Sequence, residues 1–393
     1  MKSDSSHPPK PHTGRAPLRI AQIVSLEADV PPKSQNGLEF IVSWITEGMI
    51  RRGHQVTLFA PDNSTTSARH ISTQPEQLRF DPKKVWQQPI RSMWNTTVAA
   101  MMADEFDIIH SHTGTIVFHA PFISTPAIHT LHHPAEHDVW RNLLNEPAIK
   151  KQVEPIARAF NMIHHVAVSN KQKELFQANG GDYFFSQVDV VHNGIPTSQF
   201  VPRYDAGDYL LFLGYITPHK GAHIAIDIAK RSHKKLVIAG NYYGEEEYFN
   251  TQIAPHLNDD ITYVGTADFE QKTKLYQHAE ALLVPIQWDE PFGLTLIEAA
   301  ACGTPVIAFN RGASAEIIKD GVTGFVCTNE DEAVAAVARL HTIDRRTCRL
   351  HTEEHFDAER MLDEYEALYY SLANKSLNTS TKNSPTDTTH TVQ

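Results

Sequence analysis

Cysteine is scarce in this sequence, and several short motifs of common enzyme classes are missing. The 393 residues include only Cys302, Cys327 and Cys348, whose spacing matches no zinc site, and we predict reduced thiols of a cytosolic protein. Neither H-E-x-x-H nor the Asp-x-Asp pattern that holds a divalent ion occurs, so we predict no bound metal and no cofactor. The absence of G-x-G-x-x-G and of a Walker A sequence disfavours nicotinamide oxidoreductases and P-loop NTPases.

Long apolar runs and an excess of basic charge are also absent. No stretch approaches the roughly 18 apolar residues of a membrane-spanning helix. The formal net charge of −11 disfavours nucleic acid as a partner. Histidine is abundant, with 23 copies, but pairs such as His110 with His112 and His132 with His133 suggest separate hydrogen-bonding roles rather than a metal site. Residues 1–17 lack the apolar core of a signal peptide, and residues 374–393 are rich in Ser, Thr and Asn, so both ends are predicted to be disordered.

Between these ends, apolar strand-like runs alternate with helical segments. Leu18–Val24 is predicted to be a buried parallel strand, Leu38–Arg52 an amphipathic helix and Gln55–Ala60 a second strand. The alternation begins again with a strand at 210–214 and a helix at Ala222–Arg231. A chain of this length accommodates two domains of ordinary size. The pattern therefore predicts an α/β protein with two Rossmann-like domains, and the arrangement of the two across a cleft is what the family resemblance described below implies.

The most informative stretch is residues 288–305, which connects two strand-like runs. Pro291 and Gly293 are typical of a turn, and the Ala-rich run Thr295–Ala301 predicts a helix. Unpaired N–H groups at a helix N-terminus bind anions well. At the start of this predicted helix, the N–H groups belong to Phe292, Gly293, Leu294 and Thr295.

Two carboxylates accompany this turn. Glu290 precedes it, and Glu298 lies within the helix, where a charge among Ala, Leu and Ile is costly unless it has a partner. Carboxylates accept hydrogen bonds from hydroxyl groups, so sugar and ribose are the expected partners.

These residues resemble the signature of a known family. Glu290, Pro-Phe-Gly, Glu298, the Ala-rich helix and Gly-Thr-Pro are similar to the E-x7-E signature of the retaining family-4 (group 1) glycosyltransferases of the GT-B fold. The resemblance extends over about residues 18–372 and includes Asn193-Gly194-Ile195 and a Gly-x-x-x-Glu loop at 312–316.

The resemblance implies a division of the chain. It predicts a disordered tail (1–17), an acceptor-side domain (18–204), a nucleotide-sugar-binding domain (205–355), a helix that returns to the first domain (356–373) and a second tail (374–393).

It also implies a role for individual residues. Glu298 would bind the ribose, and Glu290 with the Phe292 and Gly293 amides would hold the sugar of a UDP- or GDP-linked donor. His132, at the end of a strand, would orient that sugar. Lys220 would neutralise the diphosphate, and Gly37 would let the backbone approach it, although Gly37 also suits an ordinary turn. The implied reaction is transfer of a hexose to a hydroxyl of a small molecule, glycan or lipid-linked acceptor, with retention of anomeric configuration and without a metal.

One departure from the family pattern affects the diphosphate. The usual loop carries an arginine and a lysine, whereas Tyr215 stands at the arginine position here and Lys220 is kept. Arg311 and His219 are candidate replacements for the missing charge. The alternative reading is a weak or silent relative that binds nucleotide sugars without transferring them.

The predicted location is the cytoplasm, with attachment to a membrane surface as an alternative. The residues that suggest a membrane-facing patch are Lys83, Lys84, Trp86, Arg91, Met93 and Trp94. Such residues more often belong to an ordinary surface and core, which is the interpretation we favour.

Overall fold

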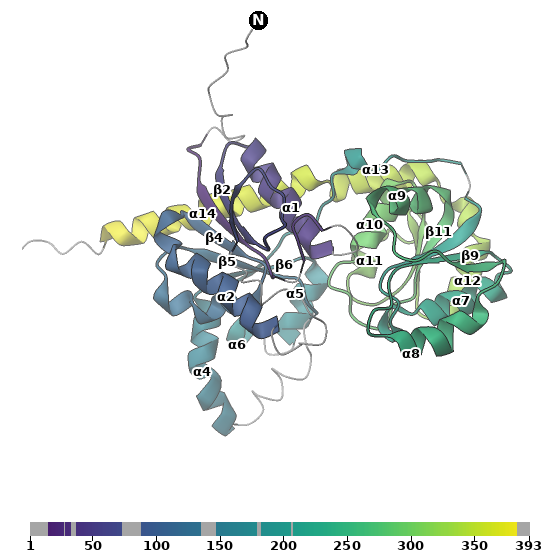
Figure 1. Cartoon of the computed structure of the whole chain (residues 1–393), viewed down its shortest axis with the longest axis horizontal. Helices are drawn as coiled ribbons and strands as arrows, with labels where there is room; N and C mark the ends of the chain where they lie inside the picture. Colours follow the sequence, from purple (N-terminus) through teal and green to yellow (C-terminus); the bar gives the residue numbers. More distant parts are fainter. Residues whose placement is uncertain are drawn as a thin grey trace, which may run out of the picture.

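The computed structural model describes residues 15–26, 28–32, 37–72, 88–134, 147–178, 182–205 and 207–382. Two parallel β-sheets, each flanked by helices, form two domains that lie side by side (Figure 1). The predicted two-domain α/β architecture is therefore confirmed. The predicted domain boundary at 204/205 falls in the connection between the two sheets.

The first sheet has seven strands in the order β3-β2-β1-β4-β5-β6-β7. Their bounds are β1 Arg19–Ile23, β2 Gln55–Ala60, β3 Arg69–Ser72, β4 Ile108–Ser111, β5 Ala127–Leu131, β6 His164–Ala167 and β7 Val188–Val190. The second sheet has six strands in the order β10-β9-β8-β11-β12-β13. Their bounds are β8 Tyr209–Leu213, β9 Leu236–Ala239, β10 Ile261–Tyr263, β11 Ala279–Val284, β12 Val306–Phe309 and β13 Gly324–Cys327.

Within the described residues, the helices of the first domain are α1 Gly37–Arg51, α2 Gln88–Met101, α4 Pro147–Asn161, α5 Asn170–Phe176 and α6 Asp182–Phe184. Those of the second domain are α7 Ala222–Arg231, α8 Glu246–Tyr248, α9 Phe269–His278, α10 Leu294–Ala301, α11 Ser314–Ile317, α12 Glu330–Ala338 and α13 Arg345–His355. Helix α14, Ala358–Lys382, follows the second domain and runs along the first (Figure 1).

Both faces of each sheet are buried, as the apolar strand sequences require. Along β1, Ile20 packs into one apolar cluster and its neighbour Ala21 into another. Along β8, Leu210 and Leu211 divide between two clusters in the same way. Successive side chains of a strand point to opposite faces, so this division shows helices packing on both sides.

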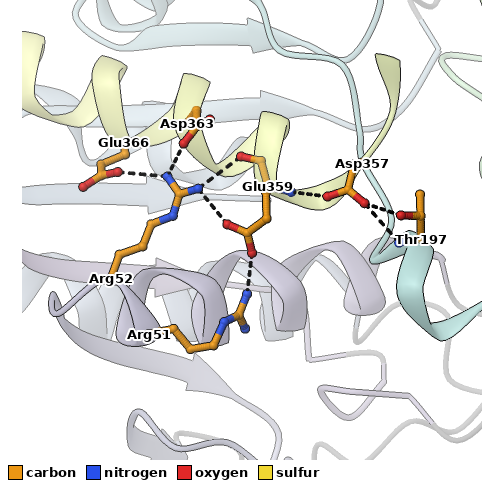
Figure 2. Close-up of polar contacts among 7 residues, drawn as sticks. All are labelled: Arg51, Arg52, Thr197, Asp357, Glu359, Asp363 and Glu366. Atoms are coloured by element: carbon orange, nitrogen blue, oxygen red, sulfur yellow. Dashed lines mark hydrogen bonds and ion pairs between the residues drawn. The ribbon is translucent and has the colours of Figure 1, made fainter. Parts of the chain in front are cut away.

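Ionic contacts hold α14 to the first domain (Figure 2). The guanidinium of Arg52, at the end of α1, is almost fully buried and bonds Glu366 at 2.9 Å, Asp363 at 2.8 Å and Glu359 at 2.8 Å. Arg51 adds a second ion pair to Glu359 at 2.9 Å. Replacing a buried arginine while its carboxylates remain costs on the order of 3–5 kcal/mol, so this pairing fixes the position of α14.

The C-terminal helix differs from the prediction in its bounds. The sequence suggested one helix from 356 to 373, whereas α13 ends at His355, α14 begins at Ala358, and α14 continues to Lys382. Helix α13 packs against α10 of the second domain, while α14 contacts α1 and β4 of the first. Within the described residues, no helix combines the length and the apolar character needed to cross a membrane.

The two domains meet through an apolar patch and a set of polar contacts. Val168 and Ile195 of the first domain pack in one cluster with Phe292 of the second. The carboxylate of Glu316, in α11, accepts hydrogen bonds from the backbone N–H groups of Asn170 and Lys171 at the start of α5. These contacts bring the loop before α10 against the first domain.

Candidate active site

A cavity of about 590 Å³ lies between the two domains. In the second domain it opens where the loops after β8 and β11 diverge, at the point where the strand order reverses, which is the usual ligand site of such sheets. All ten site residues predicted from the sequence line it. They are Gly37, His132, Tyr215, Lys220, Glu290, Phe292, Gly293, Leu294, Thr295 and Glu298.

The N-terminus of α10 faces this cavity without a capping side chain. Gly293 precedes the helix with φ of 93°, a left-handed conformation in which a side chain would be strained. Because glycine offers no side-chain acceptor, the first N–H groups of α10 stay available to a ligand, and the helix dipole favours an anion there.

Glu290 and Lys220 form an ion pair in the cavity. Lys220 Nζ lies 2.5 Å from one carboxylate oxygen of Glu290, and the Trp288 indole N–H donates to the same oxygen at 2.9 Å. Lys220 Nζ also lies 4.7 Å from the centre of the Trp288 ring, within cation–π range. The side chains of Lys220 and Glu290 are 27% and 18% exposed, so a ligand can reach both.

Two glycines allow these loops to approach each other. A Cβ on Gly221, which follows Lys220 with φ of 78°, would lie 2.2 Å from the Pro285 carbonyl oxygen. A Cβ on Gly312 would lie 2.1 Å from the carbonyl oxygen of Glu290. Both contacts are with backbone atoms that cannot move aside, which explains glycine at both positions.

Glu298 is buried and already has partners. One of its oxygens accepts a hydrogen bond from Lys272 Nζ, and the other from the Tyr276 hydroxyl at 2.9 Å. Burial and the adjacent Glu298 raise the pKa of Tyr276 well above its usual value, so this hydroxyl remains a donor. The sequence analysis missed Lys272 and Tyr276. Their only local signal is a lysine and a tyrosine four residues apart on α9.

Gly37, at the start of α1, lies close to the first residue of α10. A Cβ at this position would lie 2.7 Å from Leu294 Cδ1. The first turn of α1 therefore approaches the first turn of α10 across the cavity.

His132 contributes an imidazole from the first domain. It is half-buried, and its Nε2 lies 2.9 Å from Nδ1 of His112. Burial lowers the pKa of His132 well below its ordinary value, and the neighbouring His112 and His133 lower it further. The ring is therefore neutral at neutral pH.

The candidate replacements for the missing arginine are not at the cavity. Tyr215 lines the cavity and is 40% exposed, but Arg311 and His219 are exposed and are not among its lining residues. Among the described lining residues, Lys220 and Lys272 are the cations, and both are paired with glutamate.

Two buried polar atoms at the cavity have no partner in the described residues and were not predicted to belong to the site. Asn193 Oδ1 and Ser314 Oγ are buried, line the cavity and have no hydrogen-bond partner within the described residues. A buried acceptor or hydroxyl without a partner costs about 1–3 kcal/mol, so both are candidates for bonds to a ligand.

The suggested membrane-facing patch lies partly outside the described residues. Lys83, Lys84 and Trp86 lie outside the described residues. Arg91 is fully buried, which excludes it from such a patch, whereas Trp94 is 47% exposed.

The cysteines and possible metal ligands complete the inventory. All three cysteines are buried and unpaired, and burial raises the pKa of the Cys302 thiol to about 12. Within the parts of the chain that the structure describes, no three His, Cys, Asp or Glu side chains are grouped to hold a metal ion.

Comparison with known proteins identifies the family. Residues 35–199 match the family described as Glycosyltransferase Family 4, and residues 197–350 match Glycosyl transferases group 1. The chain is 26% identical over 367 residues to O-antigen chain mannosyltransferase C of Escherichia coli, covering 87% of this chain and 96% of the relative. It is also 26% identical to phosphatidyl-myo-inositol mannosyltransferase of Mycobacterium leprae, covering 82% of this chain and 86% of the relative.

Solved structures share the fold at lower identity. Sucrose-phosphate synthase from Thermosynechococcus elongatus superposes with a TM-score of 0.74 at 19% identity, covering 91% of this chain and all of that one. Anabaena HepE in complex with UDP and glucose gives a TM-score of 0.68 at 17% identity, covering 90% of this chain and all of that one. With the two matched families spanning residues 35–350, this chain belongs to the group 1 (family 4) glycosyltransferases and has their GT-B fold.

Proposed function

We propose that the protein transfers a hexose from a nucleoside-diphosphate sugar to an acceptor hydroxyl with retention of anomeric configuration. The observation that carries this proposal is the convergence of an uncapped helix N-terminus with Lys220, Glu290 and Glu298 on a single interdomain cavity. An anion site beside hydroxyl-binding carboxylates suits a diphosphate flanked by two sugars.

The donor would span the cavity with its diphosphate at the start of α10. Glu298 would accept hydrogen bonds from the ribose hydroxyls while Lys272 and Tyr276 hold its carboxylate in place. Glu290 would face the transferred sugar, opposite His132.

Lys220 would change partner when the donor binds. In the structure its ammonium pairs with Glu290. A diphosphate at the α10 N-terminus would compete for this ammonium. Glu290 would then keep the Trp288 indole N–H and would be able to accept from a sugar hydroxyl. As the bond to phosphate breaks, Lys220 and the α10 N–H groups would stabilise the charge that develops on the leaving group.

The transfer step needs no enzymic nucleophile. The acceptor oxygen would form a bond to the anomeric carbon on the face from which the phosphate oxygen departs. The acceptor proton would pass to that phosphate oxygen, so the products are a glycoside and a nucleoside diphosphate. Glu290 pairs with Lys220, and Glu298 of α10 pairs with Lys272. We therefore do not assign these two glutamates as a glycosidase-type carboxylate pair.

We further propose that no divalent metal takes part, because Lys220 and the helix N-terminus supply the positive potential. The missing arginine favours a second candidate, a relative that binds donors and transfers slowly or not at all. No arginine lines the cavity within the described residues, and Tyr215 brings one hydroxyl without a charge. The two mannosyltransferase relatives and the UDP-bound HepE support a hexosyl donor without deciding its nucleotide.

The test is a panel of UDP-, GDP- and ADP-hexoses, with release of nucleoside diphosphate followed with and without candidate acceptors. The proposal predicts that one donor binds, that turnover depends on acceptor, and that it survives excess chelator. NMR of the product would show the same anomeric configuration as that of the donor sugar. Binding without release would favour the silent relative, and binding of no donor would refute both candidates.

A further inference from the structure

A continuous chain of buried hydrogen bonds connects helix α14 to His132 in the cavity. The Tyr369 hydroxyl, on α14, accepts from Gln22 Nε2 at 3.1 Å. Gln22 Oε1 lies 3.0 Å from His112 Nε2, and His112 Nδ1 lies 2.9 Å from His132 Nε2. Tyr369, Gln22 and His112 are each at most 3% exposed, so water does not interrupt the chain.

The direction of each bond follows from the orientation of the Gln22 amide, whose Nε2 lies against Tyr369 and whose Oε1 lies against His112. The amide oxygen of Gln22 can only accept, so His112 Nε2 must carry a hydrogen. Burial lowers the pKa of His112 well below its ordinary value, and neighbouring histidines lower it further. A neutral His112 with a hydrogen on Nε2 has none on Nδ1. The bond to His132 must then be donated by His132 Nε2.

The other arm of the chain is consistent with this direction. Since the Tyr369 oxygen accepts from Gln22, its own hydrogen can be donated to His110 Nδ1, which lies 2.6 Å away. His110 Nε2 then donates to Thr130 Oγ1 at 2.7 Å, and Thr130 lies 2.9 Å from the Tyr365 hydroxyl. Rotating the Gln22 amide by half a turn would reverse every one of these bonds, so the amide sets the polarity of the network.

We propose that Gln22 and His112 are positioning residues that hold His132 as the neutral Nε2–H tautomer, which presents Nδ1 to the substrate as a hydrogen-bond acceptor. Within the described residues Nδ1 of His132 has no protein partner, and the side chain lines the cavity. We expect Nδ1 of His132 to accept a hydrogen bond from a hydroxyl group. The assignment of that hydroxyl to the donor sugar or to the acceptor rests on the proposed function.

The same network argues against His132 as a general base. Protonation of Nδ1 would create an imidazolium whose other nitrogen faces a neutral histidine rather than a carboxylate. An unpaired buried charge is costly, so His132 binds a hydroxyl without removing its proton. The role of α14 then extends beyond packing, because the Tyr369 hydroxyl is the hydrogen-bond partner of the Gln22 amide on the side away from His112.

Two tyrosines of α14 allow a matched pair of variants. Tyr365 and Tyr369 are both fully buried on α14, one turn apart. Tyr369→Phe removes the acceptor for Gln22, whereas Tyr365→Phe removes only the last bond of the other arm, at Thr130. Gln22→Met removes the amide at similar volume.

The experiment is nitrogen NMR of the full chain labelled at histidine, with the His132 signals assigned by their loss in His132→Gln. We expect a protonated Nε2 and an unprotonated Nδ1 in the wild type and in Tyr365→Phe, and a tautomer mixture in Gln22→Met and Tyr369→Phe. With an identified donor, the last two variants should lose about two- to tenfold in kcat/KM, the effect of one neutral hydrogen bond.

A wild-type His132 with its hydrogen on Nδ1 would overturn the proposal, and so would an unchanged tautomer in folded Gln22→Met. The wild-type spectrum alone decides the tautomer if a variant fails to fold. The spectrum does not depend on turnover, so absence of transfer would refute the proposed function and leave this result standing.

Discussion

Removing the Lys220 ammonium is the most informative single change in the cavity. Lys220 is only 27% exposed and bonds Glu290 at 2.5 Å. We expect its ammonium to move to the donor diphosphate when the donor binds. A hydrogen bond to a charged group contributes about 1.5–3 kcal/mol, so Lys220→Ala should weaken binding of the free nucleoside diphosphate about ten- to a hundredfold.

The effect on turnover should be larger than the effect on binding. Charge on the leaving phosphate grows as the glycosidic bond breaks, and loss of one preorganised donor to such a charge lowers kcat by roughly 10²–10³-fold. Tyr215 and the α10 N–H groups would be left to stabilise the diphosphate.

Calorimetry with the nucleoside diphosphate and single-turnover kinetics with the donor measure the two effects separately. Lys274→Ala is the matched control, because Lys274 also pairs with a glutamate, Glu270, but lies on the exposed surface of α9 with a side chain 66% exposed. The control should bind and transfer as the wild type does. Wild-type turnover in Lys220→Ala would refute this reading of the site.

Three further predictions follow from the same contacts. Glu298→Gln keeps the shape but loses the charge between Lys272 and Tyr276, and calorimetry should show weaker nucleotide binding, by about tenfold, in a folded protein. Gly37→Ala places a methyl group 2.7 Å from Leu294 Cδ1 and should weaken donor binding severalfold, with Leu294→Ala restoring it in the double variant; no rescue would contradict the close approach of α1 and α10. Burial alone would raise the pKa of Glu316, but hydrogen bonds from His192 and backbone N–H groups outweigh it and lower the pKa from 4.5 to about 2. A depressed pKa stabilises the fold above pH 4.5 and ceases to do so as the pH falls towards 2. Glu316→Gln should therefore cost about 2 kcal/mol in urea unfolding at pH 7 and progressively less below about pH 4.5, whereas a pH-independent cost would contradict the shift.

The sequence predicted the parts of the site that depend on local pattern. The turn at Pro291 and Gly293, the Ala-rich helix and the position of Glu290 are all encoded within residues 288–305. The residues of the first domain, such as His132, were placed by their position at the end of a strand. Carboxyl ends of parallel strands gather at one edge of a sheet, so topology brings such residues to one cavity, whereas the roles of His132, Gly37, Tyr215 and Lys220 were assigned from the resemblance to the family.

What the sequence did not reveal depends on contacts between distant residues. Lys272 reaches Glu298 from a different helix, and the bond between Gln22 and Tyr369 joins positions 347 residues apart. Gly37 was correctly placed at the cavity, yet its close neighbour is Leu294 of the other domain, which no local pattern specifies. Side-chain partners of this kind are fixed by tertiary packing, so they become visible only with the fold.

The most direct test of the account is a crystal structure with the nucleoside diphosphate that binds best in the donor panel. We predict the terminal phosphate at the N-terminus of α10, within hydrogen-bond distance of Lys220 Nζ, and the ribose hydroxyls on Glu298, with the Lys220–Glu290 bond broken. A nucleotide bound outside the interdomain cavity, or one inside it with Lys220 still on Glu290 and no phosphate at α10, would contradict the account.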